Sequence, residues 1–212
     1  MIPCWCRCPH QYARLAGALR GRREVTVLPH PGFRPGERLP VDLDAVVAAQ
    51  ARAALRCARG GPMALLGYSS GGWVAHAVAA RLEELGHSVE AVVLLDTYLQ
   101  SEMTDGLASA LTEGLFARQS ESLDTAPQSL IAMGAYFRVF ERWTPTEIAA
   151  PTLFLRAAEP LAPAEPEGPS WPLAGPVRDV PGNHFTLLED HVGPTAETVH
   201  EWLTRVAESE QE

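Results

Sequence analysis

Two adjacent serines lie between glycines in the stretch GYSSGG, residues 67–72. The stretch fits the pattern Gly-x-Ser-x-Gly, follows a short apolar run at 63–66 and precedes a helical repeat. In this context a sharp turn after a strand exposes a serine hydroxyl that can attack an acyl carbon. We therefore predict that Ser69 is a nucleophile and that the backbone N–H of Ser70 stabilises the resulting oxyanion. The alternatives are a turn that only packs and a phosphate site, but no Lys-Ser/Thr pair follows, as a nucleotide-binding loop would require.

A serine hydroxyl is unreactive unless a base removes its proton. Of the seven histidines, His184 follows a strand pattern and a Pro-Gly turn, and the other six lack a comparable strand-end setting. Two acids are candidates to orient this histidine. Asp96 ends the strand that comes after the helix following the Ser69 turn, and Glu159 ends the next strand. The chain order serine, acid, histidine holds for both. The residues alone therefore leave the acid open.

Alternating strand and helix patterns must position these residues. Strands are expected at 25–28, 63–66, 89–96, 151–156 and 177–180, and helices at 11–20, 42–59, from about 70 to 85, and near the C-terminus. The helix from 70 carries Val74, Val78, Leu82 and Leu85 on one face. A strand, a helix and a strand of these lengths form a parallel crossover unit.

Residues 99–145 contain two helical segments and no strand pattern, which predicts a helical lid inserted into the domain. The chain of 212 residues has no internal repeat and no domain boundary. We predict a single domain, 1–212, of the α/β class: an α/β-hydrolase fold with a mostly parallel sheet flanked by helices and shortened N-terminal strands.

Charge and hydropathy exclude several partners. The formal net charge of -9 comes with no basic cluster, so a nucleic-acid partner is not expected. The longest apolar run, 91–95, is far shorter than the roughly 20 residues that cross a bilayer. The N-terminus lacks the apolar region of a secretion signal. We expect a cytoplasmic protein without membrane contact.

Three cysteines, Cys4, Cys6 and Cys8, lie too close together to cross-link a fold. Cys6, Cys8 and His10 are metal-ligand types, but their spacing is tight and no second Cys/His pair follows. We predict reduced thiols and no metal site.

The sequence resembles a known family over nearly its whole length: the thioesterase domains that end modular (type I) polyketide synthases. The stretches that carry the resemblance are PHQYARLAGALRG, GYSSGGWVAHAVAARLEELGHSVEAVVLLDTY, MGAYFRVFERW and VPGNHFTLLEDH. In that family the catalytic acid lies on the strand that comes directly after the helix following the nucleophile. The resemblance therefore implies Asp96 as the partner of Ser69 and His184. An alignment through Pro9 places the second oxyanion N–H near Cys4.

The resemblance implies acyl transfer from a carrier. Ser69 would take a polyketide chain from the phosphopantetheine thioester of an acyl carrier protein, with His184 as base and then acid. Water would release a free acid, and a hydroxyl of the chain would release a macrolactone. The enzyme would need no cofactor of its own, and the resemblance allows a homodimer. Residues of the lid would line the acyl channel or pack into the core; they are Met133, Tyr136, Phe137 and Trp143.

Other functions stay open at this point. Tyr68 stands where the family usually has histidine. A tyrosine at this position also resembles the thioesterases of nonribosomal peptide synthetases. A stand-alone editing (type II) thioesterase and a general esterase would use the same residues. A catalytically weak binding module on a hydrolase fold would be favoured if the N-terminal segment around Cys4 did not supply the second oxyanion N–H.

Overall fold

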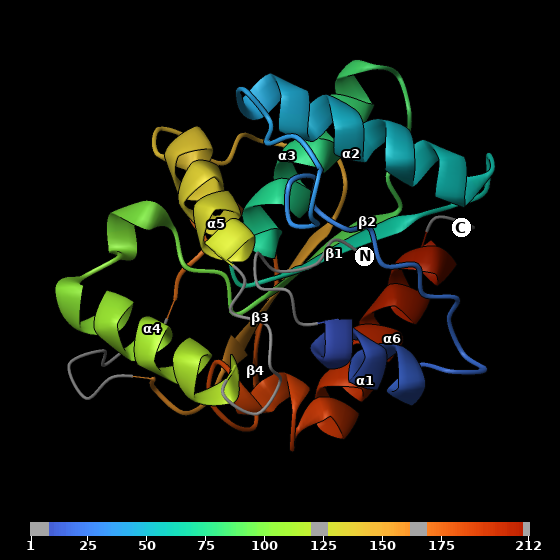
Figure 1. Ribbon diagram of the computed structural model, residues 1–212. Helices are drawn as coiled ribbons and strands as arrows, with labels where there is room; N and C mark the ends of the chain where they lie inside the picture. The colour runs from blue at the N-terminus through green and yellow to red at the C-terminus, as the bar shows by residue number, and fades with distance from the viewer. Residues whose placement is uncertain (1–8, 120–126, 162–168, 210–212) are drawn as a thin grey trace.

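Parallel strands form one sheet in the computed structural model, which describes residues 9–119, 127–161 and 169–209 (Figure 1). The strands, in sheet order, are β1 (Ala64–Tyr68), β2 (Ala91–Leu95), β3 (Thr152–Ala157) and β4 (Val177–Val180). Every neighbouring pair is parallel, which confirms the predicted type of sheet. The residues that follow these strands therefore meet at one edge of the sheet, where ligand sites of α/β proteins form.

Helices cover both faces of the sheet (Figure 1). One face is covered by α2 (Leu43–Ala58) and α3 (Gly71–Glu84), and the other by α1 (Pro9–Ala18) and α6 (Val192–Ser209). In β2, Val92 and Leu94 join the first core cluster, whereas Val93 and Leu95 join the second. Burial on both sides explains why the apolar residues of this strand run on without alternating with polar ones.

The helix boundaries follow the signals in the sequence. Asp42 caps α2, because its carboxylate accepts the N–H of Ala45 at 2.8 Å. Within α3, three of the four predicted apolar residues are fully buried, whereas Leu85 is 51% exposed. Leu85 lies beyond the last helical residue, Glu84, and the chain turns at Gly86 with a φ of 78°. The helical repeat therefore no longer orients this side chain toward the core.

Residues 25–28 do not form the strand that their apolar pattern predicts. Leu28 is buried in one core cluster and Val25 is partly buried against the other, so the apolar residues of this segment still contribute to the core. However, a groove of about 360 Å³ is lined both by this segment and by Leu65 and Leu66 of β1. The segment therefore packs beside β1 without joining the hydrogen-bonded sheet, which in the described residues begins at β1.

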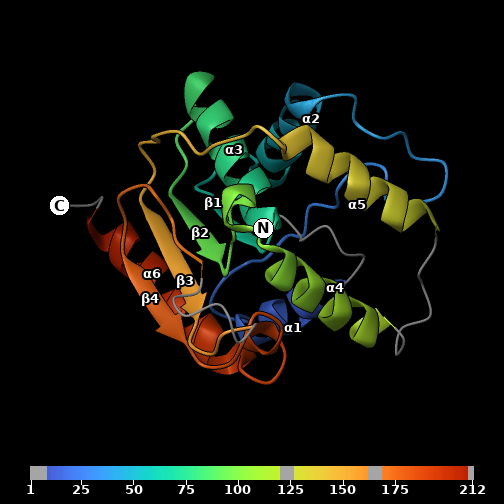
Figure 2. The same cartoon turned by 90° about the vertical axis from the view of Figure 1, so that its left-hand side faces the viewer.

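The insertion between β2 and β3 is helical, as predicted. It contains the 3-10 turn η1 (Gln100–Glu102), α4 (Asp105–Gln119) and α5 (Pro127–Phe140). Figure 2 shows α5 beside α2 and α3, and Figure 1 shows α4 at the outer left of the molecule. The Tyr136 hydroxyl donates to the carbonyl of Pro31 at 3.1 Å, and the Gln128 side chain donates to that of Gly32 at 2.8 Å. These contacts fasten α5 to the body of the domain, and movement of the insertion as a lid stays a prediction.

Core packing accounts for most of the aromatic and apolar residues that the sequence offers for an acyl channel. Tyr136 is fully buried, and Met133 and Trp143 pack against the same core cluster. Phe137 differs, because it is 42% exposed and its ring lies 6.0 Å from that of Trp73. Of these four residues, Phe137 alone combines exposure with a position near the start of α3.

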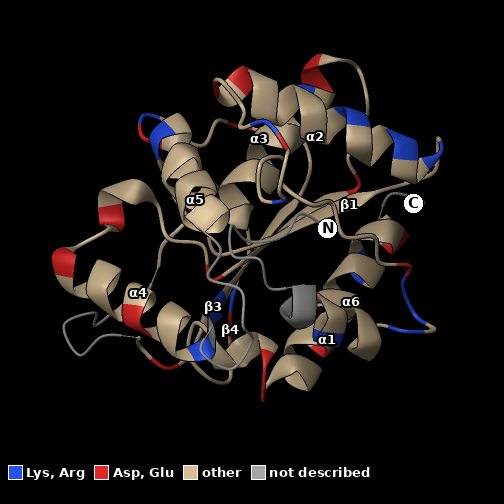
Figure 3. Ribbon diagram, viewed as in Figure 1, with Lys and Arg blue, Asp and Glu red and all other residues tan. Residues whose placement is uncertain are grey.

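Charged side chains are dispersed over the surface. On the face shown in Figure 3, blue segments lie along α2 and in the loop after α1, and red segments lie on α4. In the part of the chain that the structure describes, none of the helices combines the length and the apolar character needed to cross a bilayer.

His76 is a histidine of the core. It is 1% exposed, its ring lies between those of Trp143 and Trp171, and neither ring nitrogen has a hydrogen-bond partner among the described residues. Burial lowers the pKa of His76 to about 4 from 6.5, because the charged form cannot be solvated. The folded state therefore holds this ring neutral.

Stability should depend on pH through His76. The unfolded chain takes up a proton near pH 6.5 and the folded chain only near pH 4, so the free energy of unfolding falls as pH drops through this window, by about 3 kcal/mol. His76→Phe should remove this loss in denaturant titrations at pH 7 and pH 4. His87→Gln, at an exposed position, is the matched control and should keep the wild-type dependence. An equally steep loss in His76→Phe would contradict the assignment.

Candidate active site

A strained turn holds Ser69 directly after β1. Its φ of 55° lies in the left-handed region, which is unfavourable for a residue with a Cβ. The N–H of Ser69 donates to the carbonyl of Leu95 at 2.8 Å, which ties the turn to β2. A Cβ on Gly67 would lie 2.2 Å from the carbonyl oxygen of Gly71, so the tight approach of strand and helix requires glycine at 67. The turn has the form that the Gly-x-Ser-x-Gly pattern predicts.

A second glycine requirement was not anticipated from the sequence. A Cβ on Gly72 would lie 2.1 Å from Oγ1 of Thr97, the residue after Asp96. The first turn of α3 therefore packs directly on the segment that follows β2. The doubled glycine at 71–72 was the available signal, but its partner could be identified only from the packing.

Asp96 and His184 form a buried pair at the edge of the sheet. His184 Nδ1 lies 2.7 Å from Asp96 Oδ2, and the two side chains are 3% and 0% exposed. The other carboxylate oxygen, Oδ1, accepts the N–H of Ala157 at 2.8 Å. A carboxylate oxygen only accepts, so Nδ1 carries a proton, and in the neutral imidazole this leaves the lone pair on Nε2. An imidazole in this tautomer can act as a base at Nε2.

Tyr68 connects the serine turn to the histidine. Its hydroxyl donates to the backbone carbonyl of His184 at 2.6 Å, and the two rings are 4.9 Å apart. Tyr68 is the last residue of β1, and its backbone N–H donates to the hydroxyl of Tyr12 at 3.1 Å. Because Tyr68 immediately precedes Ser69, these bonds hold His184 beside the turn. The sequence singles out Tyr68 only as a departure from the family, without this role.

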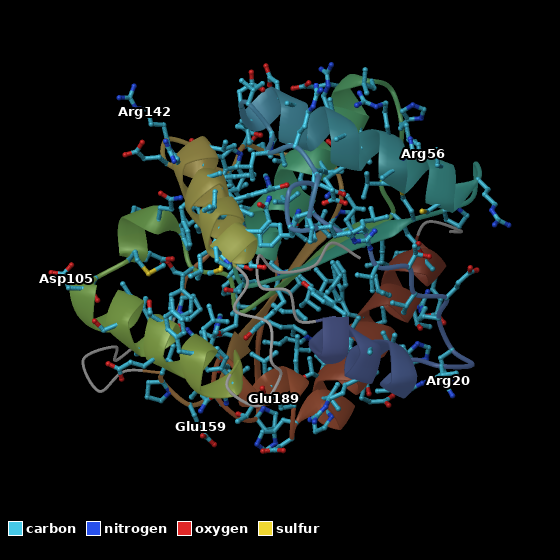
Figure 4. The ribbon with its side chains drawn as sticks, viewed as in Figure 1. Arg20, Arg56, Asp105, Arg142, Glu159 and Glu189 are labelled. Atoms are coloured by element: carbon cyan, nitrogen blue, oxygen red, sulfur yellow. The ribbon has the colours of Figure 1, made fainter. Side chains whose placement is uncertain are left out.

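The structure brings Asp96, and not Glu159, to His184. Glu159 is exposed, and its backbone N–H donates to the carbonyl of Gly182 at 2.9 Å. Figure 4 labels its side chain at the periphery of the molecule. Both acids follow parallel strands at the same edge of the sheet, but only Asp96 is in hydrogen-bond contact with the imidazole.

The N–H groups of Ser70 and Cys4 are the two proposed oxyanion donors. Ser70 is the N-cap residue of α3, so its N–H lies at the positive end of that helix. Cys4 lies outside the described residues, as do Cys6 and Cys8. Among the residues that are described, no cluster of three His, Cys, Asp or Glu side chains could hold a metal ion.

Comparisons with known proteins identify a family and several relatives of this chain. Residues 7–203 match the protein family described as Thioesterase domain. The chain is 48% identical over 200 residues to Polyketide synthase GfsE of Streptomyces halstedii, an alignment that covers 92% of this chain and 5% of that protein. It is 45% identical over 210 residues to Spectinabilin polyketide synthase system protein NorC of Streptomyces orinoci, covering 95% and 9% respectively. The chain spans less than a tenth of the length of either relative.

A solved structure supports the fold. The NocB thioesterase domain, in covalent complex with a fluorophosphonate nocardicin G analog, superimposes with a TM-score of 0.72 at 19% identity, covering 94% of this chain and 91% of that chain. The family match covers most of the chain and the parallel sheet carries the serine turn at the expected place. The chain therefore belongs to the thioesterase domain family, serine hydrolases of the α/β-hydrolase fold that need no cofactor of their own, and it is homologous to the thioesterases of polyketide synthases.

Proposed function

We propose that this chain releases a polyketide chain from an acyl carrier protein through an acyl-enzyme on Ser69. The observation that carries the proposal is the buried hydrogen bond of 2.7 Å between His184 Nδ1 and Asp96 Oδ2, next to the strained turn at Ser69. A buried imidazole with its Nδ1 committed to a carboxylate is the base that a serine nucleophile needs. The homology to polyketide synthase proteins supports the substrate class.

Acylation proceeds by attack of Ser69 Oγ on the thioester carbon. His184 Nε2 accepts the hydroxyl proton, and Asp96 stabilises the imidazolium that forms. The carbonyl oxygen becomes an oxyanion, for which the N–H groups of Ser70 and Cys4 are the proposed donors. Collapse of this intermediate breaks the C–S bond, and the imidazolium returns the proton to the departing thiolate.

Deacylation repeats these steps with a different nucleophile. His184 removes a proton from water or from a hydroxyl of the acyl chain. The oxygen of that water or hydroxyl then attacks the ester carbon on Ser69. Water gives a free acid and an internal hydroxyl gives a macrolactone. The phosphopantetheine belongs to the carrier protein, the proposed partner. The cytoplasmic location, the homodimer and the lid role of 99–145 stay predictions.

Product analysis by mass spectrometry tests the proposed function. The purified chain is given a long hydroxyacyl N-acetylcysteamine thioester, which mimics the end of phosphopantetheine. We expect release of thiol together with acid or lactone, at a rate well above the spontaneous one, and the product mass tells hydrolysis from cyclisation. Turnover of a short acetyl ester but not of the long thioester would instead indicate a general esterase. Absence of turnover with both substrates would favour the binding-module hypothesis.

A further inference from the structure

The end of α4 is fastened to the loop that carries His184. We call residues 181–191, between β4 and α6, the histidine loop. Arg118, in the last turn of α4, donates from Nε to Glu189 Oε1 at 2.8 Å and from Nη2 to Oε2 at 3.2 Å. Figure 4 shows Glu189 beside this end of α4. A two-pronged arginine–carboxylate contact fixes orientation as well as distance.

The same arginine also covers Phe185. Its guanidinium carbon lies 4.1 Å from the centre of the Phe185 ring, a cation–π geometry. One turn earlier in α4, a Cβ on Gly114 would lie 2.2 Å from Phe185 Cε2, so the helix backbone is in direct contact with the ring. Phe185 is 6% exposed as a result. The ring is held between the Arg118 side chain and the backbone of α4.

Phe185 transmits this contact to the histidine. It follows His184 in the chain, and the two rings meet edge to face with centroids 5.2 Å apart. The other ring neighbours of His184 are Tyr68 and Tyr98, at 4.9 and 5.7 Å. Movement of α4 away from the histidine loop would therefore remove the support of the imidazole on the Phe185 side.

Stability alone is a weaker explanation of this contact. Exposed ion pairs contribute little to stability, and the pair between Arg22 and Glu197 is an example on the surface of this protein. The Arg118 side chain is about as exposed as that of Arg22, but Glu189 is more buried than Glu197, at 23% against 52% exposure, and Arg118 and Glu189 meet in a bidentate geometry over an aromatic ring. The contact joins the insertion to one specific place, the residue next to His184.

We propose that Arg118 is a positioning residue for His184. Its contacts with Glu189 and Phe185 hold α4 against the histidine loop, and the imidazole reaches its working position only while α4 is seated there. The inference rests on the proposed function, because it assigns to Arg118 an effect on the base that activates Ser69. An acyl chain that displaced α4 would weaken the catalytic base, and one that seated α4 would strengthen it.

Labelling by a small alkyl fluorophosphonate tests this proposal. The probe reports how well His184 activates Ser69, and it is too small to depend on an acyl channel. Arg118→Met should lower both the labelling rate and kcat for the thioester mimic by about 10-fold to 100-fold with KM unchanged, as expected for a misplaced base. Arg118→Lys keeps a charge but loses the bidentate fork, so it should recover part of the rate. Arg22→Met, which breaks a surface pair that includes no residue of α4 or of the histidine loop, should behave as wild type.

The outcomes separate this inference from the proposed function. If wild type is labelled at Ser69 and folded Arg118→Met is labelled at the same rate with unchanged kcat, Arg118 does not position His184. If circular dichroism shows that Arg118→Met is unfolded, Arg118→Lys decides: a wild-type rate in that variant overturns the proposal, and a reduced kcat at constant KM supports it. If wild type itself is not labelled at Ser69, the proposed function fails, and the inference fails with it.

Discussion

Replacing Ser69 with alanine is expected to lower turnover of the thioester mimic by about 10⁶-fold, to the level of the uncatalysed reaction plus any residual binding effect. Ser69 is the proposed nucleophile because it occupies the strained turn directly after β1. Alanine and serine both carry a Cβ, so the φ of 55° costs the same in both proteins and stability should hardly change. Intact-protein mass spectrometry should show an acyl adduct on wild type and none on Ser69→Ala.

A matched control separates this effect from the general loss of a hydroxyl. Ser209, in the last turn of α6, is exposed and its hydroxyl donates only within its own helix, to the carbonyl of Arg205 at 2.9 Å. Ser209→Ala should keep the wild-type rate and the adduct. A covalent acyl adduct that persisted in Ser69→Ala would falsify the assignment of the nucleophile.

Asp96→Asn is expected to reduce kcat by about 10⁴-fold, by analogy with the loss seen when a triad aspartate becomes asparagine. Asp96 accepts two hydrogen bonds, one from Ala157 N and one from His184 Nδ1. Asparagine has one oxygen and one NH₂ group, so it cannot accept both. If its NH₂ faces His184, the imidazole is forced into the tautomer with the proton on Nε2, which cannot accept the proton of Ser69.

Glu159→Gln is the matched control, since it makes the same chemical change on the next strand. Glu159 is exposed and its side chain is outside hydrogen-bond contact with His184, so kcat should stay near wild type. Steady-state kinetics of the two variants on one substrate provide the measurement. A larger loss in Glu159→Gln than in Asp96→Asn would move the acid to the later strand and overturn the proposed triad.

Local sequence signals were sufficient wherever the structure depends on local geometry. The strands at Ala64–Tyr68 and Ala91–Leu95 and the capped helix after Asp42 follow from apolar runs and capping chemistry. The turn at Ser69 follows from glycines at fixed spacing, because steric contact between strand and helix excludes a Cβ there. The resemblance to polyketide synthase thioesterases, confirmed at the level of the family, rested on the same stretches.

Pairing between distant segments set the limit of these predictions. Residues 25–28 have the composition of a strand, but strand formation needs a neighbouring backbone at the right distance, and this segment does not pair with β1. The apolar residues of α5 fit a channel or a core equally well by pattern. The fold buries Tyr136 and leaves Phe137 exposed, a difference that depends on what lies opposite each side chain.

The sequence by itself determined the family, most of the order of strands and helices, and the proposed nucleophile and base, Ser69 and His184, because each of these is encoded in residue types at short spacing. Only the tertiary structure decided between Asp96 and Glu159, since both follow parallel strands and their distance to His184 depends on how the histidine loop folds back across the sheet. The contact of Arg118 with Glu189, 71 residues later in the chain, has the same origin. A hydrogen bond between residues so far apart exists only once the packed core has brought their backbones together.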